Sequence, residues 1–89
     1  MYYVYFLKNE NGKTYYGSTN DLKRRIKEHN SDKSFSTRGH LWKLVYYEAY
    51  LCEDDARMRE KQLKYHGQAL AQLKRRIKSS IKVSAGFTA

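Results

Sequence analysis

The amino-acid sequence predicts one domain of the α/β class, more closely an α+β fold, with three strands and about three helices. Aromatic and branched residues flank an Asn11-Gly12 pair, which is the strongest short signal of a β-hairpin. Later segments carry apolar residues at spacings of three and four, the period of an amphipathic helix. The 89 residues, 40% of them hydrophobic, suffice for a single core. We expect the domain to span residues 1–82, and residues 83–89, which show no period, to form a flexible tail.

The N-terminal hairpin is the first element. Residues 2–7 are aromatic and branched, as in a strand that is covered on both faces. After the turn the chain returns from Lys13 to Tyr16, so Tyr5 should lie close to one of the two tyrosines that end this strand. A glycine weakens a strand interior, so Gly17 marks either a close approach of the backbone or the exit into the next turn.

A helix is expected next, from Leu22 to His29. Either residue of Thr19-Asn20 can cap it, with Asp21 in the first turn, where a negative charge suits the helix dipole. The helical period places three residues on one inward stripe: Leu22, Ile26 and His29. By the same period Arg25 flanks the stripe and borders the core, whereas Arg24 points to solvent.

The C-terminal half is expected to supply one strand and two helices. The strand runs from Trp42 to Tyr50, after a polar loop. The acidic run Glu53–Asp55 opens a helix whose inward stripe contains Ala56, Leu63 and Gly67. Glu60 falls on that same stripe. The last helix carries a stripe of Leu70, Leu73, Ile77 and Ile81.

The charge is strongly positive and unevenly distributed. The formal net charge is +9, and no acidic residue follows Glu60. The cations after it are Lys61, Lys64, Lys74, Arg75, Arg76, Lys78 and Lys82. Such a surface attracts polyanions, so we expect a nucleic-acid partner. The alternative is a basic surface that serves only solubility.

Several other classes are disfavoured. Cys52 is the single cysteine, which excludes a disulfide framework and favours a reducing, cytoplasmic location. The longest apolar run, residues 2–7, is too short to span a bilayer, and the N-terminus lacks a signal-peptide pattern. The three histidines fit no compact zinc spacing, and Ser18 lacks convincing partners for a catalytic triad.

Three helical side chains are candidates for chemistry, each with a structural alternative. A carboxylate on an apolar stripe costs several kcal/mol if it is buried without a partner. Glu60 is therefore paired with a cation such as Arg25, Arg57 or a lysine, or it binds a metal or lines a cleft. Arg25 can bind phosphate through its planar guanidinium, or pack its stem along Leu22. His29 is either a satisfied core histidine or a participant in proton transfer.

Five sequence elements, in order and at similar spacings, resemble the GIY-YIG nuclease superfamily: Tyr3-Val4-Tyr5, Tyr15-Tyr16-Gly17, Arg25, His29 and Glu60. More narrowly, residues 2–64 resemble the small stand-alone bacterial branch related to the N-terminal incision domain of the excision-repair nuclease. Tyr3 replaces the glycine of the first motif and Tyr16 the isoleucine of the second. No asparagine follows Asn30, so the family's downstream asparagine is missing.

The resemblance implies a three-stranded antiparallel sheet flanked by helices, and metal-dependent cleavage of DNA phosphodiesters. It implies a catalytic set of Tyr5, Tyr15, Arg25, His29 and Glu60. Glu60 is implied to bind Mg²⁺ or Mn²⁺, and Arg25 to hold a phosphate oxygen. We assign the general base to Tyr5, with Tyr15 positioning water or phosphate. The pKa of a free phenol is about 10, so Arg25 or the metal must favour the phenolate, or His29 must share the proton transfer.

The predicted function is therefore a metal-dependent DNA endonuclease of repair or recombination, with branched or flapped DNA among its candidate substrates. The cations expected to bind the nucleic acid are Lys23, Arg24, Lys27, Arg38, Lys61 and Lys64. The alternatives are a non-catalytic DNA- or RNA-binding module of the same fold and a regulatory partner in a repair complex. A binding module has no use for an inward carboxylate near a phosphate. A Glu60 locked to a lysine far from Tyr5 and Arg25 would argue against catalysis.

Overall fold

The computed structural model describes the backbone of residues 1–31 and 39–86, and side chains through residue 83 within those ranges. Arg38 and the last three residues of the expected tail lie outside the described residues. The elements in chain order are β1 (Tyr2–Asn9), β2 (Thr14–Thr19), α1 (Leu22–Asn30), β3 (Trp42–Tyr50), α2 (Glu53–Tyr65), α3 (Gly67–Arg76) and α4 (Lys78–Gly86). The strands form one antiparallel sheet in the order β2-β1-β3, so the predicted α+β class and sheet are confirmed.

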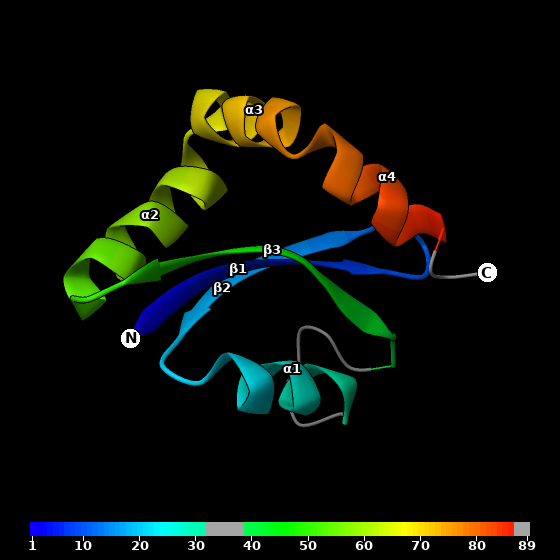
Figure 1. The fold of residues 1–89 in the computed structure, drawn as a ribbon, viewed down its shortest axis with the longest axis horizontal. Helices are drawn as coiled ribbons and strands as arrows, with labels where there is room; N and C mark the ends of the chain where they lie inside the picture. The colour runs from blue at the N-terminus through cyan, green and yellow to red at the C-terminus, as the bar shows by residue number, and fades with distance from the viewer. Residues whose placement is uncertain (32–38, 87–89) are drawn as a thin grey trace.

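The sheet lies between two helical layers. Helix α1 covers one face, and α2, α3 and α4 cover the other (Figure 1). Successive side chains of the central strand alternate between these faces. On the α1 side a core forms from Tyr5, Leu7 and Trp42, with Tyr15, Leu22 and Ile26 packed against it. On the other side the core consists of Val4, Phe6, Ala56, Leu63, Leu73 and Ile77. The prediction that β1 is covered on both faces is confirmed.

The hairpin turn is organised by one buried asparagine. The Oδ1 atom of Asn9 accepts hydrogen bonds from the backbone N–H groups of Asn11 and Lys13, both at 2.9 Å. Gly12 takes a φ of +82°, the left-handed conformation that glycine adopts without steric cost. Strand β2 then continues past Gly17 to Thr19, so Gly17 lies within the strand and not at its exit.

Helix α1 is held at both ends by side chains. Asp21 is its N-cap, and its carboxylate accepts a hydrogen bond from the backbone N–H of Arg24 at 3.0 Å. The prediction that Thr19 or Asn20 caps the helix is therefore wrong. The Thr19 hydroxyl instead accepts a hydrogen bond from the backbone N–H of Asp21. At the other end the Asn30 amide bonds to both the carbonyl and the N–H of Trp42, at 3.0 and 2.7 Å. These bonds join α1 to the first residue of β3.

A half-buried polar network fixes α2 against β3. The Glu48 carboxylate accepts hydrogen bonds from the hydroxyls of Tyr46, at 2.8 Å, and Tyr50. It also accepts two bonds from Nε of Arg59, at 3.1 Å each. Arg59 immediately precedes Glu60, so this network sets the rotation of α2 at the residue that bears the candidate carboxylate.

The C-terminal helices depart from the prediction in three respects. Gly67 is exposed and opens α3, so it does not lie on the inward stripe of α2. The expected single helix is divided at Ile77 into α3 and α4, because Ile77 leaves helical geometry while its side chain stays in the core. Helix α4 extends over residues 83–86, where a tail was expected. Among the described residues no helix is both long and apolar enough to cross a membrane.

Candidate active site

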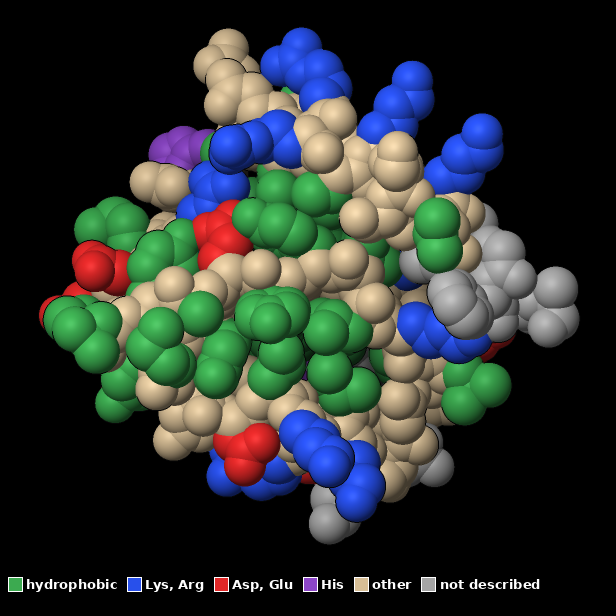
Figure 2. All heavy atoms as spheres, in the orientation of Figure 1, with side chains coloured by type: hydrophobic (Ala, Val, Ile, Leu, Met, Phe, Trp, Pro, Cys, Tyr) green, Lys and Arg blue, Asp and Glu red, His purple; other side chains and the backbone are tan. Residues whose placement is uncertain are grey.

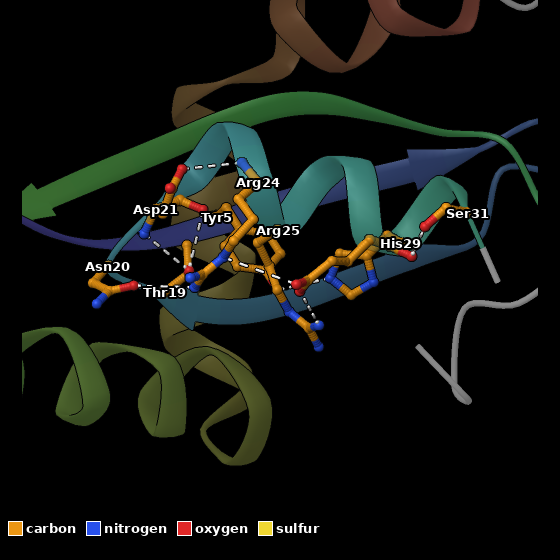
Figure 3. Close-up of polar contacts among 9 residues, drawn as sticks. Tyr5, Thr19, Asn20, Asp21, Arg24, Arg25, His29 and Ser31 are labelled. Atoms are coloured by element: carbon orange, nitrogen blue, oxygen red, sulfur yellow. Dashed lines mark hydrogen bonds and ion pairs between the residues drawn. The ribbon is translucent and has the colours of Figure 1, made fainter. Parts of the chain in front are cut away.

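A buried hydrogen bond joins β1 to α1. The Tyr5 hydroxyl lies 2.8 Å from Nε2 of His29, and these two side chains are 1% and 0% exposed. Strand alternation turns Tyr5 toward α1, and His29 stands on the inward stripe of α1, as its spacing predicted. Figure 3 shows both residues. His29 is therefore buried and hydrogen-bonded, and its partner is the tyrosine of the first motif.

Arg25 lies one helical turn before His29. Its Nη1 lies 2.9 Å from Oε1 of Glu28 (Figure 3), and its positive charge acts to lower the pKa of Tyr5. The Arg25 side chain is 30% exposed, whereas that of Arg24 is 57% exposed. The distinction that the helical period made between these neighbouring arginines is confirmed.

Strand β2 adds a second tyrosine and the space that both phenols need. The Tyr15 ring centre lies 6.3 Å from that of Tyr5 and 4.8 Å from that of His29. These three rings form the aromatic cluster. Gly17 pairs with Tyr5 across the hairpin. A Cβ at position 17 would lie 2.5 Å from the Tyr5 hydroxyl oxygen and 2.7 Å from its Cζ. Gly17 therefore marks a close approach, and a larger residue there would displace the Tyr5 phenol.

Glu60 approaches this cluster from α2. Its Oε1 accepts a hydrogen bond from the Ser18 hydroxyl at 2.5 Å, and its Oε2 lies 2.7 Å from Nζ of Lys64. The predicted alternative, an ion pair with a lysine, is thus present. Nζ of Lys64 lies 5.7 Å from the centre of the Tyr15 ring, so the Glu60–Lys64 ion pair meets the aromatic cluster through its lysine. Burial raises the pKa of Tyr5, and the Glu60 charge contributes to that rise.

Sequence reasoning missed one partner of Glu60, the Ser18 hydroxyl, because it assessed Ser18 only as a nucleophile. It predicted an ion pair with a lysine but did not identify Lys64, which it assigned to nucleic-acid binding. The spacing of four residues on one helix is a readable signal for the Glu60–Lys64 pair. No local pattern signals the bond to Ser18, since 42 positions separate the two residues and tertiary packing alone brings them together.

Burial sets the protonation states of the buried pair. Burial raises the pKa of Tyr5 to about 12, although the neighbouring Arg25 guanidinium acts in the opposite direction. Burial, with the Arg25 charge, lowers the pKa of His29 to about 4. Burial also acts to lower the pKa of Arg25, but the Glu28 carboxylate and the nearby Tyr5 hydroxyl outweigh this and raise it. At neutral pH, Tyr5 is therefore protonated, His29 neutral and Arg25 charged.

Positive side chains surround the cluster and continue beyond it. The predicted nucleic-acid contacts that the structure describes are all exposed: Lys23, Arg24, Lys27, Lys61 and Lys64. Figure 2 shows further lysine and arginine side chains over α3 and α4. The exposed cations of these two helices are Lys74, Arg75, Arg76, Lys78 and Lys82. The positive surface thus extends across both helical layers.

Similarity to known proteins agrees with this arrangement. Residues 1–75 match the family model of the GIY-YIG catalytic domain. The chain belongs to the GIY-YIG family. This GIY-YIG domain is 42% identical over 67 residues to UPF0213 protein CPE1444 of Clostridium perfringens (strain 13 / Type A), covering 72% of this chain and 71% of that protein. It also resembles the solution NMR structure of UPF0213 protein BH0048 from Bacillus halodurans, with 36% identity, a TM-score of 0.50, and coverage of 83% of this chain and 86% of that one.

The two substitutions within the tyrosine motifs, Tyr3 and Tyr16, are packing positions. Tyr3 makes an edge contact with Tyr47 on β3, with ring centres 5.9 Å apart. Tyr16 packs edge-to-face on Phe6, at 4.8 Å, against the core on the opposite side of the sheet from Tyr5. Neither ring contributes to the Tyr5–His29 pair, so the aromatic cluster of this GIY-YIG domain is compatible with both substitutions.

The donor chemistry around Glu60 fits a divalent cation bound together with phosphate. Within residues 1–31 and 39–86 no three His, Cys, Asp or Glu side chains gather as a metal-binding group. Glu60 and the Ser18 hydroxyl are hard oxygen donors, which suit Mg²⁺ or Mn²⁺, and Mg²⁺ commonly keeps waters and shares substrate phosphates. Lys64 would have to leave Oε2. That ion pair spans one helical turn and is partly exposed, and such pairs contribute only about 0.3–0.5 kcal/mol.

Proposed function

We propose that this GIY-YIG domain is a metal-dependent endonuclease that hydrolyses phosphodiester bonds of DNA. The observation that carries the proposal is a cluster of Tyr5 of β1 and Tyr15 of β2, with the charge of Arg25 of α1 acting on Tyr5 and with Glu60 of α2 paired to Lys64 beside the Tyr15 ring. A module that only binds nucleic acid needs the surrounding cations. It gains nothing from a carboxylate placed among them, which repels phosphate.

Arg25 and Glu60 take the electrostatic roles. Glu28 orients the Arg25 guanidinium, which has five N–H donors and therefore retains donors for a phosphate oxygen. A charge fixed there stabilises the negative charge that develops on the phosphate as it is attacked. Glu60, oriented by Ser18, would hold the metal, which supplies Lewis-acid stabilisation of a phosphate oxygen and of the leaving oxygen.

Tyr5 and His29 take the proton. A free phenolate is not the resting form, because burial raises the pKa of Tyr5 to about 12. The 2.8 Å contact allows a concerted relay instead: the Tyr5 oxygen accepts a proton from the attacking water as its own proton passes to Nε2 of His29. His29 is neutral at physiological pH and so is available as the acceptor. Tyr15, whose ring stacks on Tyr5 and is tilted against His29, positions the water or the phosphate.

The biological setting is also part of the proposal. We place the enzyme in DNA repair or recombination, with branched or flapped DNA as the first substrates to test and Mg²⁺ or Mn²⁺ as the metal. The single exposed thiol, Cys52, is compatible with a reducing cytoplasmic location. The second candidate is a binding module of the same fold, favoured by the ion pair between Glu60 and Lys64.

A cleavage assay on a panel of DNA forms separates the two candidates. Branched, flapped, nicked and plain duplex DNA would be incubated with Mg²⁺, Mn²⁺ or EDTA. The variant Arg25→Met removes the proposed phosphate ligand. The variant Arg75→Met is its matched control, with the same loss of charge from an exposed position on α3.

Cleavage by the wild type and by Arg75→Met, abolished by EDTA and reduced about 10²- to 10³-fold in Arg25→Met, supports the enzyme. Metal-dependent cleavage that persists unchanged in Arg25→Met contradicts the assignment of the site. Binding of DNA without cleavage of any form, under every metal condition, favours the binding module.

A further inference from the structure

A polar groove of about 370 Å³ opens beside the aromatic cluster, between α1 and the first turns of α2. Its floor includes Ser18 of β2, which hydrogen-bonds to Glu60, and its α1 wall includes Arg25. The groove is therefore continuous with the proposed catalytic site. Two more arginines line the groove, Arg24 of α1 and Arg57 of α2; both are more exposed than Arg25 and are called the outer arginines below.

The two outer arginines are held at the groove by weak contacts. Nη2 of Arg24 donates to Oδ1 of Asn20 at 3.2 Å (Figure 3), and its Nε lies 3.9 Å from Glu28, beyond hydrogen-bond distance. Nη2 of Arg57 lies 2.5 Å from Glu53 across one turn of α2, in a pair that is largely exposed. Exposed pairs of this kind contribute little to stability. Both guanidiniums can therefore turn to an anion that enters the groove.

The mixture of groups in the groove indicates the chemical class of its ligand. Planar guanidiniums bind phosphate bidentately, while the Ser18 hydroxyl and the Asn20 amide offer hydrogen bonds. Two carboxylates, Glu28 and Glu53, also line the groove, but each is paired with one of its arginines, and the three arginines leave the groove with a net positive charge. The Tyr2 ring contributes an aromatic wall against which a sugar or base can pack. A ligand with phosphate at one end and a ring at the other matches this combination.

We propose that this groove holds the nucleotide next to the scissile phosphate, with its far phosphate between Arg24 and Arg57. The inference rests on the proposed function in one respect, namely that the scissile phosphate lies at Arg25. Arg25 lines both the groove and the proposed catalytic site. A DNA strand that places one phosphate at Arg25 therefore directs the adjacent phosphate toward Arg24 and Arg57.

The basic surface of α3 provides the contrast. The shallow depression there is lined by Gln72, Arg75 and Arg76, without a hydroxyl or an aromatic wall. It offers charge, and so attracts any polyanion, but it has no features that select a nucleotide. The double variant Arg75→Ala/Arg76→Ala is thus a control with the same loss of charge as Arg24→Ala/Arg57→Ala.

Calorimetric or NMR titration with small nucleotides tests the groove without any cleavage. The probes are thymidine 3′,5′-bisphosphate and the two thymidine monophosphates, added to the whole protein in EDTA. Two occupied phosphate sites should make the bisphosphate bind about tenfold more tightly than either monophosphate. This preference should fall below about threefold in Arg24→Ala/Arg57→Ala and persist in Arg75→Ala/Arg76→Ala. All four arginines are exposed, so the substitutions should leave the fold intact, and circular dichroism of each variant would check that it is folded.

The outcomes for the groove and for the enzyme are separate. A bisphosphate that binds no better than the monophosphates, or a preference that survives in Arg24→Ala/Arg57→Ala, overturns the groove assignment even if DNA is cleaved. A preference that requires Arg24 and Arg57 supports the groove, even if no DNA is cleaved and the proposed enzyme fails.

Discussion

Replacing Gly17 with alanine should lower both the free energy of unfolding and the cleavage rate, because the added methyl group would occupy space that the Tyr5 phenol fills. The added methyl would lie 2.5 Å from the Tyr5 hydroxyl oxygen, 2.7 Å from its Cζ and 3.2 Å from Cε1 of Tyr15. Contacts under 3.0 Å cannot persist, so one partner must move. Tyr5 is buried and hydrogen-bonded to His29, and it cannot swing outward as a surface side chain would.

The size of the effect follows from this geometry. Inserting a methyl group into a packed core costs about 1–3 kcal/mol, which for a domain of this length lowers the melting temperature by roughly 5–20 °C. Relief of the clash displaces the Tyr5 hydroxyl by an appreciable fraction of an ångström. Misplacement of a reacting group by about 1 Å reduces a rate by about 10²-fold, so cleavage should fall by that order while the protein remains folded.

The assay combines thermal denaturation with single-turnover cleavage of the DNA form that the panel identifies. The matched control is Gly67→Ala, where the new Cβ meets no atom within 4 Å. Gly67 opens a helix, so alanine there should be neutral or slightly stabilising and should leave the rate unchanged. A Gly17→Ala variant with wild-type stability and rate would refute the close approach, and with it the placement of Tyr5.

Three further predictions concern the same cluster. Because burial holds the pKa of His29 near 4, against about 6.5 when unfolded, the unfolded state binds more protons between these values. Stability in urea titrations should therefore fall by up to about 3 kcal/mol as the pH drops from 6.5 to 4, and by less in His29→Gln. Tyr5→Phe should lower the single-turnover rate about 10²- to 10⁴-fold, and a rate near wild type would exclude Tyr5 as base. Lys64→Met should reduce the Mg²⁺ concentration needed for half-maximal cleavage, because it frees Oε2 of Glu60, and Lys61→Met should leave it unchanged.

Local patterns predicted the parts of the fold that local forces determine. The hairpin follows from Asn11-Gly12, where a glycine can adopt the positive φ that the turn requires. The helical period correctly predicted that Arg25 borders the core and that Arg24 points to solvent, because successive residues of a helix point in different directions around its axis. The inward position of His29 followed from the same period.

Other features depend on long-range packing and left no local signal. The apolar spacing of four continues across Ile77, so the sequence alone cannot reveal that the chain leaves helical geometry there to follow the sheet. The N-cap was assigned to the wrong residue because Thr19, Asn20 and Asp21 are all competent caps, and the exit from β2 selects among them. The partner of Glu60 on β2, Ser18, is set by the docking of α2.

The central claim is that Glu60 provides the metal-binding carboxylate of a site that cuts DNA. It is tested most directly by single-turnover cleavage across a Mg²⁺ series, for the wild type and for Glu60→Gln. The exposed carboxylate variant Asp54→Asn on the same helix serves as the control. We predict a loss of at least about 10²-fold in Glu60→Gln, with metal dependence abolished or moved to far higher concentration, and no change in Asp54→Asn. A Glu60→Gln variant that cleaves at the wild-type rate with the same Mg²⁺ dependence would contradict the claim.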